Sequence, residues 1–124
     1  MKNIVLIAAV ALFSVAAFAQ QPPKFLRDSY PTHALQAALG ARAVLEGSQA
    51  KLDAKTRELI ALGVAAQIPC TYCVHAHTRN ARAHGASDAE SREAVATAAT
   101  VRHWSTVLNG MAVDFEAFKA ELGR

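Results

Sequence analysis

The strongest signal for the fold lies in residues 53–90, which read DAKTRELIALGVAAQIPCTYCVHAHTRNARAHGASDAE. Asp53 is a favourable N-cap, and the helix after it must end before Pro69, because a residue preceding proline avoids the helical conformation. The next helix is predicted over residues 70–85, where it stops at a glycine. The SDAE segment at residues 87–90 has the pattern of a capping box. We therefore predict three successive helices joined by short turns.

Composition extends the helical prediction to the rest of the chain. Alanine, the best helix former, supplies 22 of the 105 residues after position 19, whereas Val and Ile together supply nine. A helix is expected over residues 32–46, and the helix that opens at the capping box should reach about Leu108. Asn109-Gly110 either breaks or weakens the pattern before a last helix through Phe115 and Phe118.

The predicted organisation is a single all-α domain, a small bundle of about five helices. Residues 32–124 form this domain, and residues 20–31 form a proline-containing, extended lead-in. A length of 124 residues excludes a multidomain enzyme. Basic residues are scattered rather than interleaved with aromatics, so we expect no binding to nucleic acid.

Residues 1–19 have the features of a secretory signal peptide. Lys2 gives a positive start, residues 4–18 are almost wholly apolar, and AFA at residues 17–19 places small side chains where signal peptidase reads the chain. This apolar run is shorter than the roughly 20 residues of a spanning helix. We predict cleavage after Ala19, export to the oxidising periplasm and no membrane attachment afterwards; an uncleaved anchor is the alternative.

Four reactive side chains lie close together in the sequence. These are Glu58, Cys70, Cys73 and His77. If Pro69 sets the start of a helix, the two cysteines and the histidine occupy positions i, i+3 and i+7, which share one face. The cysteines can then form a disulfide across the first turn. An antiparallel turn before that helix would bring the carboxylate of Glu58 to the imidazole.

This arrangement suits thiol redox chemistry without a bound cofactor. A helix N-terminus stabilises a thiolate, and CxxC thiols there have pKa values below the usual value of about 8.5. A carboxylate beside His77 fixes its tautomer and makes the ring a better acceptor for the thiol proton. The thiolate attacks a peroxide and becomes a sulfenic acid, which the second cysteine converts to a disulfide. An external dithiol must then reduce that disulfide.

The spacing leaves the order of the two sulfurs open. Proximity to His77 favours Cys73 as the peroxidatic thiol, whereas the helix terminus favours Cys70. We assign the attack on peroxide to Cys73, and the resolving role and contact with the reductant to Cys70.

The two cysteines are also compatible with uses other than redox chemistry. A structural disulfide is a common use in an exported protein, but a four-residue loop adds only about 2 kcal/mol of stability. Haem attachment requires a histidine where this chain has Val74. Zinc could bind Cys70, Cys73 and His77, with Glu58 as a fourth ligand. Thiol-disulfide exchange without peroxide chemistry remains the second enzymatic alternative, and a binding domain with a structural disulfide is the non-catalytic one.

The same residues support a family resemblance. LDAKTRELI at residues 52–60, CTYCVHAHT at residues 70–78 and GAS at residues 85–87 resemble the alkylhydroperoxidase D-like core of the carboxymuconolactone decarboxylase family. The resemblance covers roughly residues 52–107. It implies an all-helical fold and a thiol peroxidase whose proton relay and redox pair are the four side chains named above. Lactone decarboxylases of the wider family generally lack the paired cysteines, which disfavours decarboxylation.

The resemblance also bears on partners. It implies assembly into trimers or hexamers, and leftover apolar side chains such as Trp104, Val107 and Phe118 fit a contact between subunits. Characterised alkylhydroperoxidase D-type proteins are cytoplasmic and are reduced through a lipoylated partner. Because we predict export, we expect a different reductant, an exported dithiol protein of thioredoxin type.

Overall fold

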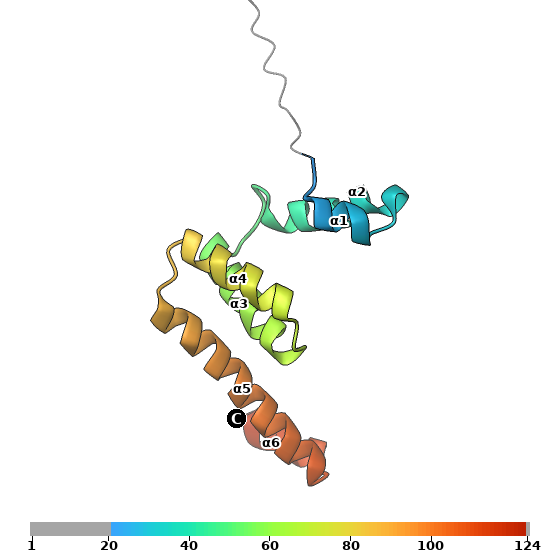
Figure 1. The fold of residues 1–124 in the computed structure, drawn as a ribbon. Coiled ribbons are helices and arrows are strands. Elements are labelled where there is room, and N and C mark those ends of the chain that lie inside the picture. Colours follow the sequence, from blue (N-terminus) through green and yellow to red (C-terminus); the bar gives the residue numbers. More distant parts are fainter. Residues whose placement is uncertain (1–20, 124) are drawn as a thin grey trace, which may run out of the picture. The chain divides into compact units, whose positions relative to one another are not determined.

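The computed structural model describes residues 21–123, which contain six helices and no strand (Figure 1). The all-α prediction is confirmed, with one helix more than the five expected. The described chain divides into two compact units between Ala41 and Arg42. The helices are α1 (Lys24–Ser29), α2 (Thr32–Glu46), α3 (Ala54–Gln67), α4 (Thr71–Ala83), α5 (Asp88–Gly110) and α6 (Phe115–Leu122).

The extra helix, α1, corrects the prediction of an extended lead-in over residues 20–31. Pro23 occupies the N-cap position, and its carbonyl accepts from the backbone N–H groups of Leu26 and Arg27. A proline costs nothing at the start of a helix, because the first N–H groups have no partner within the helix. Lys24 and Asp28 then form an ion pair one turn apart. The prolines mark where helices begin.

The second unit begins each of its three main helices at a capping side chain, and the sequence predicts two of these caps, at the starts of α3 and α5. Asp53 accepts a bond of 2.9 Å from the backbone N–H of Thr56, and Ser87 forms a reciprocal capping box with Glu90. The sulfur of Cys70 accepts from the backbone of Cys73 and caps α4. Local side-chain chemistry therefore sets the starts of α3, α4 and α5, as the sequence indicated.

Helix α5 is longer than predicted. Asn109 and Gly110 continue the helix, and the side-chain amide of Asn109 donates to the carbonyl of Ser105 at 2.7 Å. The break comes two residues later at Ala112, whose φ of 48° lies in the left-handed region. Asp114 then caps α6 by accepting from Ala117.

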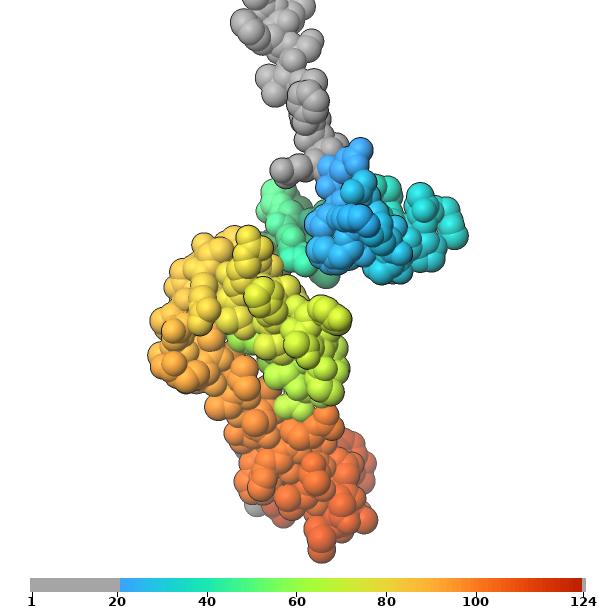
Figure 2. Space-filling view, viewed as in Figure 1, coloured from blue at the N-terminus to red at the C-terminus, as the bar shows by residue number. Residues whose placement is uncertain are grey.

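Helix α3 is central to the second unit, since it packs against both α4 and α5. Its buried side chains include Leu62 and Ala65, which form a core with Ala81 of α4 and Ala86 of the following turn. A Cβ added at Gly63 would lie 3.4 Å from that of Ala98, so small residues allow α3 and α5 to approach closely. Figure 2 shows α4 and the start of α5 in contact on one face of this unit. This packing positions the charged residues of α3.

The predicted signal peptide, residues 1–19, lies outside the described residues. Within residues 21–123, no helix combines the length and hydropathy needed to cross a bilayer.

Candidate active site

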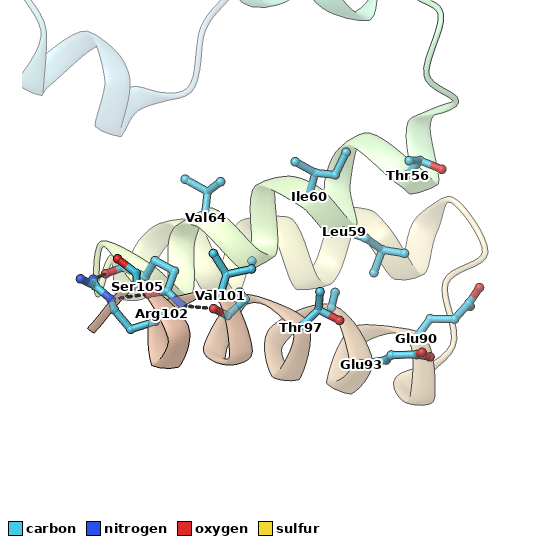
Figure 3. A pocket seen from close by; sticks show the side chains of 14 residues that line it. Thr56, Leu59, Ile60, Val64, Glu90, Glu93, Thr97, Val101, Arg102 and Ser105 are labelled. Carbon is cyan, nitrogen blue, oxygen red and sulfur yellow. Dashed lines mark hydrogen bonds between the residues drawn. The ribbon is translucent and has the colours of Figure 1, made fainter. Parts of the chain in front are cut away.

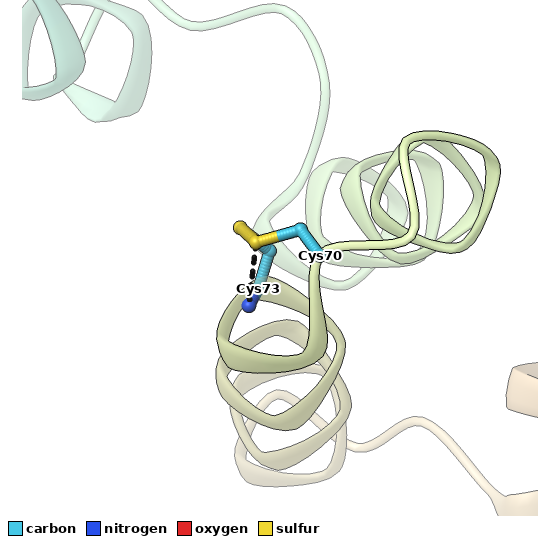
Figure 4. Close-up of a disulfide and its surroundings, with 2 residues drawn as sticks. All are labelled: Cys70 and Cys73. Atoms are coloured by element: carbon cyan, nitrogen blue, oxygen red, sulfur yellow. Dashed lines mark hydrogen bonds between the residues drawn. A yellow bond between two sulfur atoms is a disulfide. The ribbon is translucent and has the colours of Figure 1, made fainter.

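Cys70 and Cys73 form a disulfide at the start of α4 (Figure 4). Their Cα atoms are 5.2 Å apart, and the sulfur of Cys70 also accepts the backbone N–H of Cys73 at 3.2 Å. The expectation that these residues can bond across the first turn is confirmed. Both residues are partly exposed, and Tyr72 between them is 89% exposed. The disulfide therefore lies at the surface, where small oxidants and dithiols have access.

The carboxylate of Glu58 contacts the imidazole of His77, as the antiparallel packing of α3 and α4 predicted. Oε2 of Glu58 lies 2.6 Å from Nδ1 of His77. Glu58 is only 7% exposed, so it projects into the contact between the two helices rather than into solvent. Because a carboxylate accepts, Nδ1 is the ring nitrogen that donates, which leaves Nε2 to exchange a proton with another group.

His77 lies one helical turn after Cys73 in α4, and therefore on the same side of that helix. The structure thus brings Glu58, His77 and the disulfide together at the junction of α3 and α4. All four predicted site residues belong to this one locality. Their catalytic roles remain predictions.

Sequence reasoning missed a fifth residue at this site, Arg42 of α2. Its Nη2 lies 3.4 Å from Oε1 of Glu58, and its Nε donates to Glu46 at 2.7 Å. Arg42 is the first residue of the second unit, so these contacts are internal to that unit. The i,i+4 spacing to Glu46 was visible in the sequence. No local pattern connects Arg42 to Glu58, because sixteen residues and a turn separate them.

A second charged contact joins α3 to α5 away from the cysteines. Lys55 donates to Glu90 at 2.8 Å, and Ser87 donates to the same carboxylate through its backbone and hydroxyl. These bonds, with that from Lys55 the strongest, lower the pKa of Glu90 from 4.5 to about 2. This pair lies apart from the disulfide and from His77. Its role is therefore structural: it joins the start of α3 to the start of α5.

An open groove of about 750 Å³ runs between α3 and α5 (Figure 3). Neither cysteine lines it. At one end Arg102 reaches across to α3 and donates to the side chain and backbone of Gln67. The groove is therefore a feature of the α3–α5 face, separate from the candidate site. Its apolar lining includes Leu59, Ile60, Val64 and Val101.

Among residues 21–123, no group of three or more His, Cys, Asp or Glu side chains is arranged to hold a metal ion. In this structure both sulfurs are bonded to each other. The zinc alternative would require a reduced and rearranged site, because a thiolate is the form that binds metal.

Comparison with known proteins identifies a family and a similar protein. Residues 31–115 match the sequence profile of the carboxymuconolactone decarboxylase family. A protein of Paracoccus denitrificans described as "Uncharacterized protein 4 in cox locus" is 39% identical over 51 residues, which is 41% of this chain. That match covers 46% of the relative, so the chain spans less than half of its length.

Proposed function

Because the chain belongs to the carboxymuconolactone decarboxylase family and carries a CxxC disulfide beside a Glu-His pair, we propose that it is a thiol peroxidase that reduces alkyl hydroperoxides. The single observation that carries this proposal is the 2.6 Å contact between Glu58 and His77. A structural disulfide needs no such pair. A thiol that must lose a proton, and an alkoxide that must gain one, both need a group of this kind.

The first step consumes the peroxide. His77 takes the proton of the Cys73 thiol on Nε2, while Glu58 holds the ring through Nδ1. The thiolate attacks one peroxide oxygen, an S–O bond forms and the O–O bond breaks. The proton passes from His77 to the departing alkoxide, which gives an alcohol. Cys73 is now a sulfenic acid, oxidised by the two electrons that the peroxide accepted.

The second step closes the disulfide seen in the structure. The Cys70 thiol attacks the sulfenic sulfur of Cys73, the S–S bond forms, and hydroxide leaves as water after taking the proton. Two electrons from an external dithiol then restore both thiols, while that dithiol becomes a disulfide. We assign contact with the reductant to Cys70, because its position before the first turn of α4 leaves it at the end of the helix.

We also propose that the protein is exported and works as a homo-oligomer. The support for export is the signal-like pattern of residues 1–19, which indicates an exported thioredoxin-type dithiol as the reductant. The support for assembly is an apolar surface, defined here as the α3–α5 face, that no part of the second unit covers among its described residues. Its large exposed members are Ile60, Val64 and Val101.

Thiol-disulfide exchange with other proteins is the second candidate. The observation that favours it is the exposure of the disulfide and of Tyr72, which gives a protein partner access to the sulfurs. Exchange does not require the Glu58–His77 pair. The two candidates therefore differ in their response to the same substitution.

The test is anaerobic titration of the reduced protein with cumene hydroperoxide, with thiol loss scored per equivalent. The peroxidase proposal expects two thiols lost per peroxide and a rate that falls about a hundredfold in Glu58→Gln. Glu93→Gln, on the exposed surface of α5, is the matched control and should keep the wild-type rate. Thiols that react no faster than free cysteine would contradict the proposal. Rapid disulfide exchange that survives Glu58→Gln would favour the second candidate.

The order of the sulfurs has its own test. Cys70→Ser should accumulate a sulfenic acid on Cys73 that a dimedone probe traps, whereas Cys73→Ser should trap none. Trapping on Cys70 alone would reverse the assignment.

A further inference from the structure

Resting on the proposed function, we propose that Arg42 is a positioning residue of the proton relay, the permanent counter-charge that holds the Glu58 carboxylate in place for His77. The two oxygens of this carboxylate are divided between two partners. Oε1 faces Arg42 at 3.4 Å and Oε2 faces His77 at 2.6 Å. Arg42 is itself held from the other side by Glu46. Glu46, Arg42 and Glu58 thus alternate in charge, and the ring of His77 ends this chain of contacts.

The burial of Glu58 makes a counter-charge necessary. A carboxylate removed from water is costly unless it is paired, and Glu58 is 7% exposed. If Arg42 were absent, the ring itself would be the only partner of this carboxylate that could supply a positive charge, and only by carrying a second proton. A doubly protonated ring cannot accept a proton from a thiol. The guanidinium of Arg42 carries its charge at every relevant pH. It can therefore supply the positive charge opposite the Glu58 carboxylate, so that the ring does not need a second proton.

The other charged groups around His77 do not replace Arg42. From α5, Asp88 pairs with Arg82, and both line a second groove with Arg92, Val74 and Thr78, on a side of α4 that does not hold His77. On α4 itself, His75 and Arg79 are exposed. From α3, Glu58 is the charged group in contact with the ring. The ionic surroundings of His77 are therefore set by Glu58 and, through it, by Arg42.

The first experiment follows the protonation of the His77 ring and needs no peroxide. Proton resonances of the His77 ring are followed against pH in the disulfide form of wild type, Arg42→Gln and Arg42→Lys. We expect the ring of Arg42→Gln to keep its second proton to a higher pH than wild type, and Arg42→Lys to return toward wild type. Arg82→Gln is the matched control, since it also removes an exposed arginine from a carboxylate and should leave the titration unchanged. Identical titrations in wild type and Arg42→Gln would overturn the inference.

The second experiment uses the rate of thiol oxidation by cumene hydroperoxide. Arg42 is half-exposed, so the expected loss in Arg42→Gln at neutral pH is moderate, about fivefold, with the rise of rate moved to higher pH. In the Glu58→Gln background the same substitution should have no further effect, because its target is gone. An equal loss in both backgrounds would contradict a role through Glu58. If no variant reacts with peroxide, the proposed function fails while the ring titration still decides the role of Arg42.

Discussion

Helix α3 has two faces that differ in how completely this chain covers them. Toward α4 it buries Leu62 and Ala65 and places Glu58 against His77. Toward the groove along α5 it leaves Ile60 and Val64 more than half exposed. The first face is covered by α4 of the same chain and carries Glu58, one of the candidate active-site residues. The second exposes apolar side chains beside charged ones such as Glu93 and Arg102, and the assembly proposal rests on this exposed apolar surface.

The largest expected effect is a loss of stability from a substitution on the face of α3 that α4 covers. Leu62 is 2% exposed, and Leu62→Ala should lower the free energy of unfolding by about 3 kcal/mol, because it removes buried surface and leaves a cavity. Val64→Ala is the comparison on the same helix, at 54% exposure, and should cost less than about 1 kcal/mol in a single chain. Urea unfolding measures both. Equal losses of unfolding free energy in the two variants at low protein concentration would contradict the difference in burial between the two faces.

A charged side chain placed on the exposed α3–α5 face tests whether this face takes part in self-association. Val64→Asp should weaken self-association by at least about tenfold, because an ionised carboxylate is costly to bury in an apolar contact. Light scattering over a range of concentrations gives the assembly state, and far-ultraviolet circular dichroism checks that the helices persist. Wild-type protein that stays monomeric at micromolar concentration would remove the basis for the assembly proposal.

A smaller effect is expected where α5 begins. Ser87→Ala removes the hydroxyl that accepts from the backbone of Glu90 at 3.1 Å and should cost about 1 kcal/mol in unfolding free energy. Ser105→Ala, also on the exposed surface of α5, is the control and should cost less. A loss in Ser87→Ala no greater than in Ser105→Ala would show that this cap does not hold α5 against α3.

The smallest effect expected is the acid dependence of the contact between Lys55 and Glu90. The pKa of Glu90 is lowered from 4.5 to about 2 in the folded protein. The ion pair therefore stabilises the folded protein above pH 4.5, and this contribution is lost as the pH falls toward 2. Because both side chains are partly exposed to solvent, salt should reduce the contribution of the pair to the free energy of unfolding. Urea unfolding from pH 6 to pH 2 should show Lys55→Met losing less stability than wild type. Parallel curves would contradict the pairing.

The predictable parts of the fold are those that local chemistry decides. Asp53, Pro69 and the capping box set helix boundaries through contacts within four residues, and all three were visible in the sequence. The same locality explains the error over residues 20–31. The prolines there favour an extended chain, but Pro23 opens α1. The sequence leaves open whether Asn109-Gly110 breaks or only weakens the helix, and the structure continues α5 through Gly110.

The candidate site shows a similar division. The approach of Glu58 to His77 was predictable, because one tight turn joins α3 to α4 and fixes which way they run. Arg42 was not, because its contact depends on how the end of α2 lies beside α3. A guanidinium on an exposed helix face has the same local sequence context whether or not it reaches a buried carboxylate.

The capping role of Cys70 has a practical consequence for engineering. Serine is among the preferred residues at a helix N-cap, so Cys70→Ser removes the sulfur while it keeps an acceptor for the N–H of Cys73. Alanine would remove both. The serine variant should therefore start α4 at the same residue with no dithiol to close, which makes it a suitable scaffold for crystallising the dimedone adduct of a Cys73 sulfenic acid.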